Sequence, residues 1–161
     1  MVHGVGGYLE LDSDPGFGTT VLMYLPTFPL ESNGTSSERH TVLIWHSDQR
    51  ELHRLVRIME FLDFHVGTAT GLPALLAERD EMLSRERTVD LVVIGASDDS
   101  TACSSMQQWR SLEPEIPVLV SFMGDTGSCV GERNESIPAI GYETPFSEIV
   151  AVVQRLIGDG D

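Results

Sequence analysis

The sequence contains no lysine, and its ten basic residues are arginines set against 25 acidic residues. The formal charge of −15 repels a phosphate backbone and leaves no basic stripe for DNA, so nucleic-acid binding is not expected. No apolar run reaches the roughly 20 residues that span a bilayer. Glycines and an acidic stretch follow Met1 in place of a secretory signal. We therefore expect a cytoplasmic protein without direct membrane contact.

Cysteine is also scarce. Cys103 and Cys129 lie far apart, and neither belongs to a CxxC or Cys/His motif. The spacing predicts neither a metal site nor a disulfide framework. We interpret both as ordinary small residues and expect no cofactor.

Three segments differ in composition. Residues 1–26 contain two alternating runs, 8–12 and 19–25, separated by a turn at 14–18, and this pattern predicts a β-hairpin. Residues 27–39 lack periodicity and are predicted to be a flexible linker. The remaining residues, 40–161, are long enough for one domain with a real core.

Apolar strand-like runs alternate with amphipathic helical patterns from His40 onward, which predicts an α/β domain with a parallel sheet covered on both faces. In the last helix we expect Thr144 as a cap and Pro145 in the first turn. Between Gly124 and Ser136, two glycines and few apolar residues predict a short or missing helix. The predicted strands are 41–45, 64–66, 91–94, 116–121 and 137–142, and the predicted helices cover 52–62, 72–83, 103–112 and 145–157.

Five βα units, the strand sequence at 115–120 and the Pro145-Phe146-Ser147 helix start resemble the receiver domain of response regulators and hybrid histidine kinases. A generic flavodoxin-like domain would show the same alternation, but the 142–146 junction favours a receiver. The resemblance implies a flavodoxin-like (βα)5 three-layer sandwich with strand order 2-1-3-4-5. It also implies chemistry at the carboxyl edge of the sheet.

Each functional position of the receiver family is altered in this sequence. The acidic pair that holds Mg²⁺ corresponds to His46 and Ser47, which lack the carboxylate oxygens that the ion prefers. The phosphoacceptor corresponds to Gly95, which has no nucleophile. The hydroxyl position falls on Phe122, or on Ser121 if the strand is shifted by one residue. The lysine corresponds to Thr144. The resemblance thus implies a degenerate site with no catalytic residue, phosphoacceptor or metal.

Neighbouring side chains offer alternatives. Asp48 follows the altered acidic pair, and Asp98 and Asp99 follow Gly95 closely. Phosphoryl transfer needs its groups placed within about an ångström. We therefore interpret Asp98 and Asp99 as a solvated acidic turn, with phosphorylation of either as the alternative. His46 is interpreted as structural, with phosphohistidine or metal ligation as the alternative.

The first 26 residues resemble the end of the ATP-binding domain of sensor histidine kinases, through Pro15-Gly16, Gly18-Thr19-Thr20 and Leu25-Pro26. Under this resemblance Gly16, Gly18 and Thr19 are a remnant of the ATP-binding site. The family's asparagine helix and Asp-x-Gly-x-Gly loop are absent from the sequence, and an isolated hairpin is marginally stable. We expect no ATP binding by this chain alone.

Three functions remain open. The first is a non-phosphorylatable pseudo-receiver that acts by contact with a histidine kinase or another signalling protein. The second is the C-terminal tail of a hybrid histidine kinase that functions only within the longer polypeptide. A stand-alone ligand-binding domain is least favoured, because no phosphate-cradling glycine loop follows the first strand. We expect no enzymatic activity from this chain alone, and the sequence predicts no oligomeric state.

Overall fold

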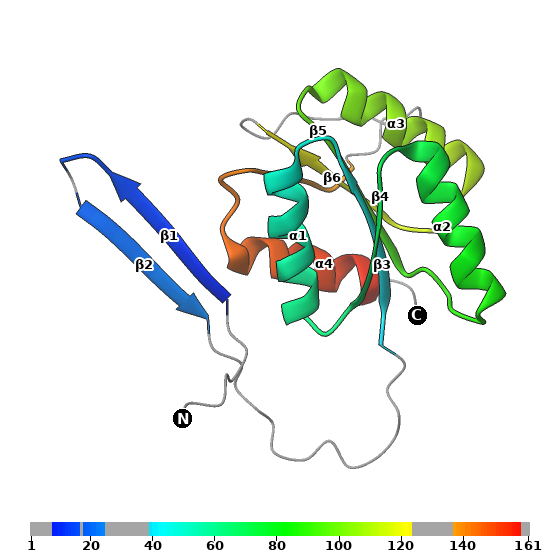
Figure 1. Cartoon of the computed structure of the whole chain (residues 1–161), viewed down its shortest axis with the longest axis horizontal. Coiled ribbons are helices and arrows are strands. Elements are labelled where there is room, and N and C mark those ends of the chain that lie inside the picture. Colours follow the sequence, from blue (N-terminus) through cyan, green and yellow to red (C-terminus); the bar gives the residue numbers. More distant parts are fainter. Residues whose placement is uncertain (1–7, 17, 25–38, 124–136, 159–161) are drawn as a thin grey trace, which may run out of the picture. The chain divides into compact units, whose positions relative to one another are not determined.

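A computed structural model describes residues 8–16, 18–24, 39–123 and 137–158. The chain divides into two compact units, residues 1–39 and 40–161, which are described separately (Figure 1). Most of the predicted linker and the predicted weak helix at 124–136 lie outside the described residues.

The first unit contains the predicted hairpin. Strands β1 (Tyr8–Asp14) and β2 (Gly18–Tyr24) pair antiparallel in one continuous register. Gly16 has φ +93°, a conformation that glycine adopts at no steric cost. The backbone of the turn therefore accounts for a glycine at this position. Leu9 lies opposite Met23, and Leu11 lies opposite Val21; these four side chains are 49–64% exposed.

The second unit is built on a five-stranded parallel sheet in the order β4-β3-β5-β6-β7. Counted from β3, this is the predicted order 2-1-3-4-5, and the prediction is confirmed. Strands β3, β5 and β6 are buried at every residue, as expected for parallel strands covered on both faces. The strands are β3 (Thr41–His46), β4 (His65–Ala69), β5 (Leu91–Ala96), β6 (Val118–Phe122) and β7 (Ala139–Gly141).

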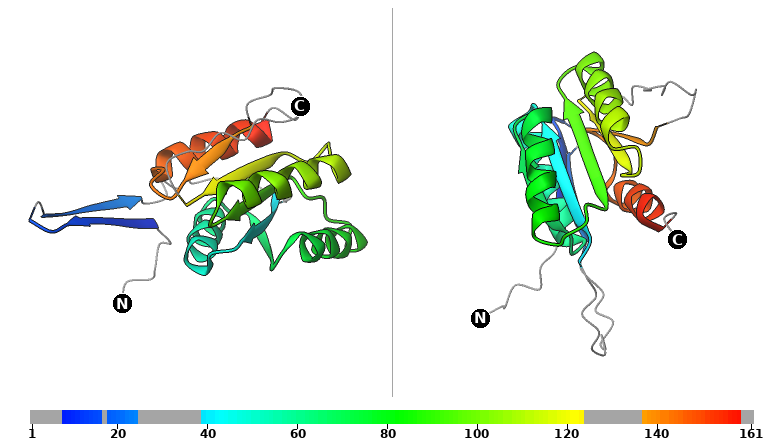
Figure 2. Two further views of the ribbon diagram at one scale, coloured as in Figure 1. Left: turned by 90° about the horizontal axis from the view of Figure 1, so that it is seen from above. Right: turned by 90° about the vertical axis from the view of Figure 1, so that its right-hand side faces the viewer.

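Within residues 39–123 and 137–158, four helices cover these strands (Figure 2). Asp48 caps α1 and Asp98 caps α3, and each accepts hydrogen bonds from first-turn backbone N–H groups. Thr144 does not play the predicted capping role, because its hydroxyl accepts a hydrogen bond from Gly141 N–H at 2.6 Å. The helices are α1 (Gln49–Phe61), α2 (Leu72–Ser84), α3 (Asp99–Leu112) and α4 (Phe146–Gly158).

The core has two sides because successive strand side chains point to opposite faces of the sheet. One cluster joins α2 and α3 to alternate positions of the strands, and it includes Trp45, Ile94 and Phe122. On α1 and α4, Phe61 meets Phe146 edge to face with ring centres 5.3 Å apart, which places these two helices together. Positions of the opposite parity, including His46 and Gly95, therefore face the α1 and α4 side.

One cysteine differs from the expectation. Cys103, half-buried on α3 against the core, is disulfide-bonded. Its interpretation as an ordinary small residue is therefore wrong. The other cysteine in the sequence, Cys129, lies outside the described residues. No sequence motif signals this bond, because Cys103 belongs to no CxxC or Cys/His pattern.

Within the described ranges, no helix is long and apolar enough to cross a membrane.

Candidate functional site

The carboxyl ends of β3, β5 and β6 bring three of the predicted positions side by side. In the parallel register His46 lies beside Gly95, and Gly95 lies beside Ser121. This is the edge of the sheet at which open α/β folds bind ligands. The predicted convergence of these positions is therefore present in the structure.

The His46 imidazole fills the space in front of Gly95. A β-carbon added to Gly95 would lie 2.1 Å from His46 Cδ2, 2.6 Å from Nε2 and 3.0 Å from Ser121 Cβ. These separations are far below van der Waals contact, so no side chain fits at position 95 while the ring is in place. His46 is 2% exposed, and its ring closes the position that a phosphoacceptor would occupy.

The protonation of this ring follows from its hydrogen bond. Asp48 N–H donates to His46 Nδ1 at 2.9 Å, so Nδ1 contributes its lone pair and the neutral ring carries its proton on Nε2. A protonated Nε2 has no lone pair for a phosphoryl group or a metal ion. Burial lowers the pKa of His46, and the negative charge of the Asp48 carboxylate acts in the opposite direction. These contacts support the structural interpretation of His46.

The register distinguishes the two predicted hydroxyl positions. Ser121 lies beside Gly95 and is fully buried, whereas Phe122 belongs to the hydrophobic cluster of α2 and α3. Among the described groups, neither Ser121 Oγ nor His46 Nε2 has a hydrogen-bond partner. His46 Nε2 and Ser121 Cβ both lie close to the β-carbon position of Gly95. Of the two residues, the fold therefore brings the polar one, Ser121, into this site.

Ser47 joins the loops that follow β3 and β5. Its backbone N–H donates to the Gly95 carbonyl at 3.2 Å, and its hydroxyl accepts from Ser97 N–H at 2.8 Å. The two serine hydroxyls are 3.1 Å apart. Ser47 therefore connects the loop after β3 to the loop after β5. Ser97 had no recognisable signal in the sequence.

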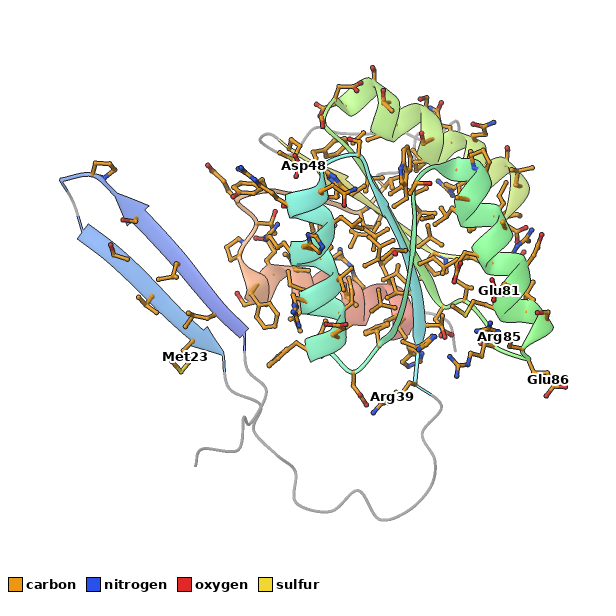
Figure 3. All side chains as sticks on the ribbon, in the orientation of Figure 1. Met23, Arg39, Asp48, Glu81, Arg85 and Glu86 are labelled. Atoms are coloured by element: carbon orange, nitrogen blue, oxygen red, sulfur yellow. The ribbon has the colours of Figure 1, made fainter. Side chains whose placement is uncertain are left out.

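The nearby aspartates are helix caps. Asp48, at the start of α1 (Figure 3), accepts hydrogen bonds from the N–H groups of Arg50 and Glu51 at 2.9 and 3.0 Å. The Glu51 N–H makes the largest contribution to lowering the pKa of Asp48. Asp98 accepts from the Ser100 hydroxyl and from Thr101 N–H at 2.7 and 2.8 Å.

The two aspartates that follow Gly95 lie at the exposed start of α3. The Ser100 hydroxyl contributes most to a lowered pKa of Asp98. Asp99 lies in the first turn of α3 and is exposed. The predicted acidic turn is thus exposed to solvent.

A cation that the sequence did not indicate approaches the Thr144 position. Arg54 of α1 donates to the Thr144 carbonyl at 2.9 Å and to the carboxylate of Glu51 at 2.5 Å. Glu51 is fully buried, and this burial raises its pKa although Arg54 opposes the shift. The only sequence signal was the i, i+3 spacing of an acid and a base, which is usually a surface pair.

The other predicted residues lie elsewhere. Gly16 is in the hairpin turn, Gly18 opens β2, and Thr19 is hydrogen-bonded to the Ser13 hydroxyl at 2.9 Å. In the part of the chain that the structure describes, no three His, Cys, Asp or Glu side chains are grouped to hold a metal ion.

The buried imidazole predicts a pH dependence of stability. Below the ordinary histidine pKa of 6.5, unfolded His46 takes up a proton while folded His46 remains neutral, because its folded pKa is lower. As pH decreases below 6.5, the free energy of unfolding should therefore decrease. The contribution of this group is at most about 1.4 kcal/mol per pH unit, and it ends where pH reaches the folded pKa. Urea unfolding at several pH values measures the slope.

His46→Gln should reduce that slope, and the exposed α1 variant His53→Gln should leave it unchanged. An identical slope in wild type and His46→Gln would rule out the buried neutral ring.

Comparison with known families gives one match to a family model. The family described as "Flagellar regulatory protein FleQ" matches residues 41–147. No curated protein matches the sequence.

Solved receiver structures share the fold at low sequence identity. A CheY-like receiver domain protein from Methanospirillum hungatei JF-1 has a TM-score of 0.58 and 13% identity, over 76% of this chain and 96% of that one. A putative response regulator from Chloroflexus aurantiacus J-10-fl has a TM-score of 0.61 and 16% identity, over 75% and 99%. The receiver domain of an HD domain-containing protein from Pseudomonas fluorescens Pf-5 has a TM-score of 0.59 and 16% identity, over 81% and 95%. At these identities the likeness concerns the fold.

Proposed function

We propose a function for this chain, which belongs to the family of the flagellar regulatory protein FleQ. Its receiver-like domain is a pseudo-receiver that is not phosphorylated and acts by protein contact. The domain has the receiver fold, and the proposal concerns its chemistry. We place it in the cytoplasm, with a histidine kinase or another signalling protein as its partner.

The position of the His46 ring carries this proposal. The ring occupies the volume that an aspartate at position 95 would need, and Gly95 itself has no acceptor atom. The neighbouring positions hold a serine hydroxyl and a protonated ring nitrogen, which are poor ligands for Mg²⁺. The acceptor group and the carboxylate ligands for Mg²⁺ are thus both missing at these positions. The His46 ring fills the space in front of Gly95.

Incubation with acetyl phosphate and Mg²⁺ should leave the mass of the full chain unchanged. Beryllofluoride, which imitates a bound phosphoryl group, should leave the amide NMR spectrum unchanged, since there is no carboxylate for it to join. A phosphorylatable receiver treated in parallel is the positive control. An acid-labile phosphate on the chain, or amide shifts centred on Gly95, would contradict the proposal.

The name of the family suggests the process in which the contact takes place. From that name we propose that the contacts of this chain take part in flagellar regulation. A chromosomal deletion that changes flagellin expression would support this role, and unchanged expression in that deletion would count against it.

The hairpin favours a second candidate, the C-terminal tail of a hybrid histidine kinase. The observation in its favour is the pairing of β1 with β2 around the Pro15-Gly16 turn, in the segment that resembles a kinase ATP-binding domain. Reading the DNA upstream of Met1 tests it. An open frame that encodes the asparagine helix and the Asp-x-Gly-x-Gly loop is expected under this candidate, and an in-frame stop would eliminate it.

A further inference from the structure

A buried ion pair within α1 joins Glu51 to Arg54, one turn further along the helix. Glu51 is 0% exposed, and one of its carboxylate oxygens accepts a hydrogen bond from Arg54 at 2.5 Å. Its other oxygen has no partner among the described residues. A buried ion pair is weak evidence for stability, because well-packed apolar side chains are often equally stabilising. A contribution to stability therefore does not by itself explain why this ion pair is buried.

Arg54 makes two further contacts, both to the turn between β7 and α4. Its second terminal nitrogen donates to the Thr144 carbonyl at 2.9 Å, across 90 residues of sequence. Its guanidinium lies over the Tyr142 ring, 5.8 Å from the centroid. The planar guanidinium group suits this geometry. Its two terminal nitrogens donate to different acceptors, and its flat face lies over the aromatic ring. One side chain thus holds both ends of the turn.

Among the described residues, the 142–144 turn has few other anchors, and the next contact with α1 is that of Phe146 with Phe61. β7 has only three residues and lies at the edge of the sheet, paired with β6 alone. Within the turn, Gly141 and Thr144 bond to each other, through Gly141 N–H to the threonine hydroxyl and Thr144 N–H to the glycine carbonyl. These bonds shape the turn but do not tie it to another element. Tyr142 is 53% exposed, so its position on the surface depends on what holds the turn.

We propose that Arg54, oriented by Glu51, is a clasp that fixes the 142–144 turn against α1 and sets the position of Tyr142. The Arg54 clasp comprises Glu51, Arg54, Tyr142 and Thr144. It is a positioning device, and it does not depend on whether the domain can be phosphorylated.

Arg54→Lys tests the clasp in the full chain. The variant keeps a positive charge near Glu51 but loses the fork and the stacking face. Amide hydrogen exchange of Gly141 and Thr144 should accelerate about tenfold or more, as expected for loss of a charge-assisted hydrogen bond. The ring-proton shifts of Tyr142 should move as well. Exchange in the central strand β5 should stay unchanged.

Arg57→Lys is the matched control, one turn along the same helix. Arg57 is 80% exposed and approaches only the Glu60 carboxylate, at 3.6 Å, so none of these signals should move. The clasp is refuted if Arg54→Lys leaves Gly141 and Thr144 unchanged. An equal acceleration in β5 would also refute it, because that result would show general destabilisation in place of a local release.

Discussion

Gly95→Ala should lower the free energy of unfolding by about 2–3 kcal/mol, the cost of overpacking a filled core position. The new methyl group would lie 2.1 Å from His46 Cδ2 in the present arrangement. The ring cannot move aside without losing its hydrogen bond from Asp48 N–H and its buried place beside Ser121. Urea unfolding followed by the fluorescence of Trp45 and Trp109, both buried, measures the change.

The conflict between the methyl group and the ring can be isolated with a double-mutant cycle. His46→Ala removes the ring, so His46→Ala/Gly95→Ala should be more stable than the sum of the single effects predicts, by about 2 kcal/mol. Gly158→Ala is the control, since an added β-carbon there meets nothing within 4 Å and its stability should not fall. Strict additivity in the cycle would mean that the ring does not occupy the space at Gly95.

The same geometry governs any attempt to restore an acceptor. Gly95→Asp brings back the carboxylate in sequence, but its side chain would enter the volume of the His46 ring. Acceptor chemistry therefore requires substitution of His46 together with Gly95.

Arg54→Met should lower the free energy of unfolding by about 3–5 kcal/mol at pH 7, because it leaves the Glu51 carboxylate buried without a partner. Burial already raises the pKa of Glu51, and loss of Arg54 should raise it further. The folded state then binds a proton more readily than the unfolded state, whose glutamate has a pKa of 4.5. The deficit should therefore grow as pH rises above this value and shrink as pH falls towards it. Urea unfolding between pH 5 and pH 8 tests both the size and the sign.

Replacement of both partners should be far milder. Glu51→Leu/Arg54→Met buries no charge and should lie within about 2 kcal/mol of wild type. Arg57→Met is the control for loss of an exposed arginine on α1 and should change stability by less than about 0.5 kcal/mol. If Arg54→Met is equally destabilising at every pH, its effect arises from packing and not from the charge of Glu51.

Much of the fold could be predicted from the sequence. The run at 91–94 is entirely aliphatic, and it became β5, a strand buried at every residue. The amphipathic pattern at 52–62 became α1, although the helix begins earlier, at Gln49, because Asp48 caps it. Such patterns are local, since side chains a few residues apart share a face. The strand order came from the receiver resemblance and agrees with the structure.

The candidate site was predictable in part. The strand ends placed His46 and Gly95 at one edge, and parallel strands bring their carboxyl ends together. The choice between Phe122 and Ser121 needed the register of β6 against β5, because a shift of one residue exchanges the two faces. The role of Asp98 as a cap needed the start of α3.

The sequence by itself determined the α/β class and the absence of an acceptor at position 95, because both depend on residue type and short-range periodicity. Only the tertiary structure decided that the His46 ring fills the space at Gly95, that Arg54 reaches Thr144 across 90 residues, and that Cys103 is disulfide-bonded. These features depend on the orientation of side chains brought together from distant segments, which neither spacing nor composition encodes.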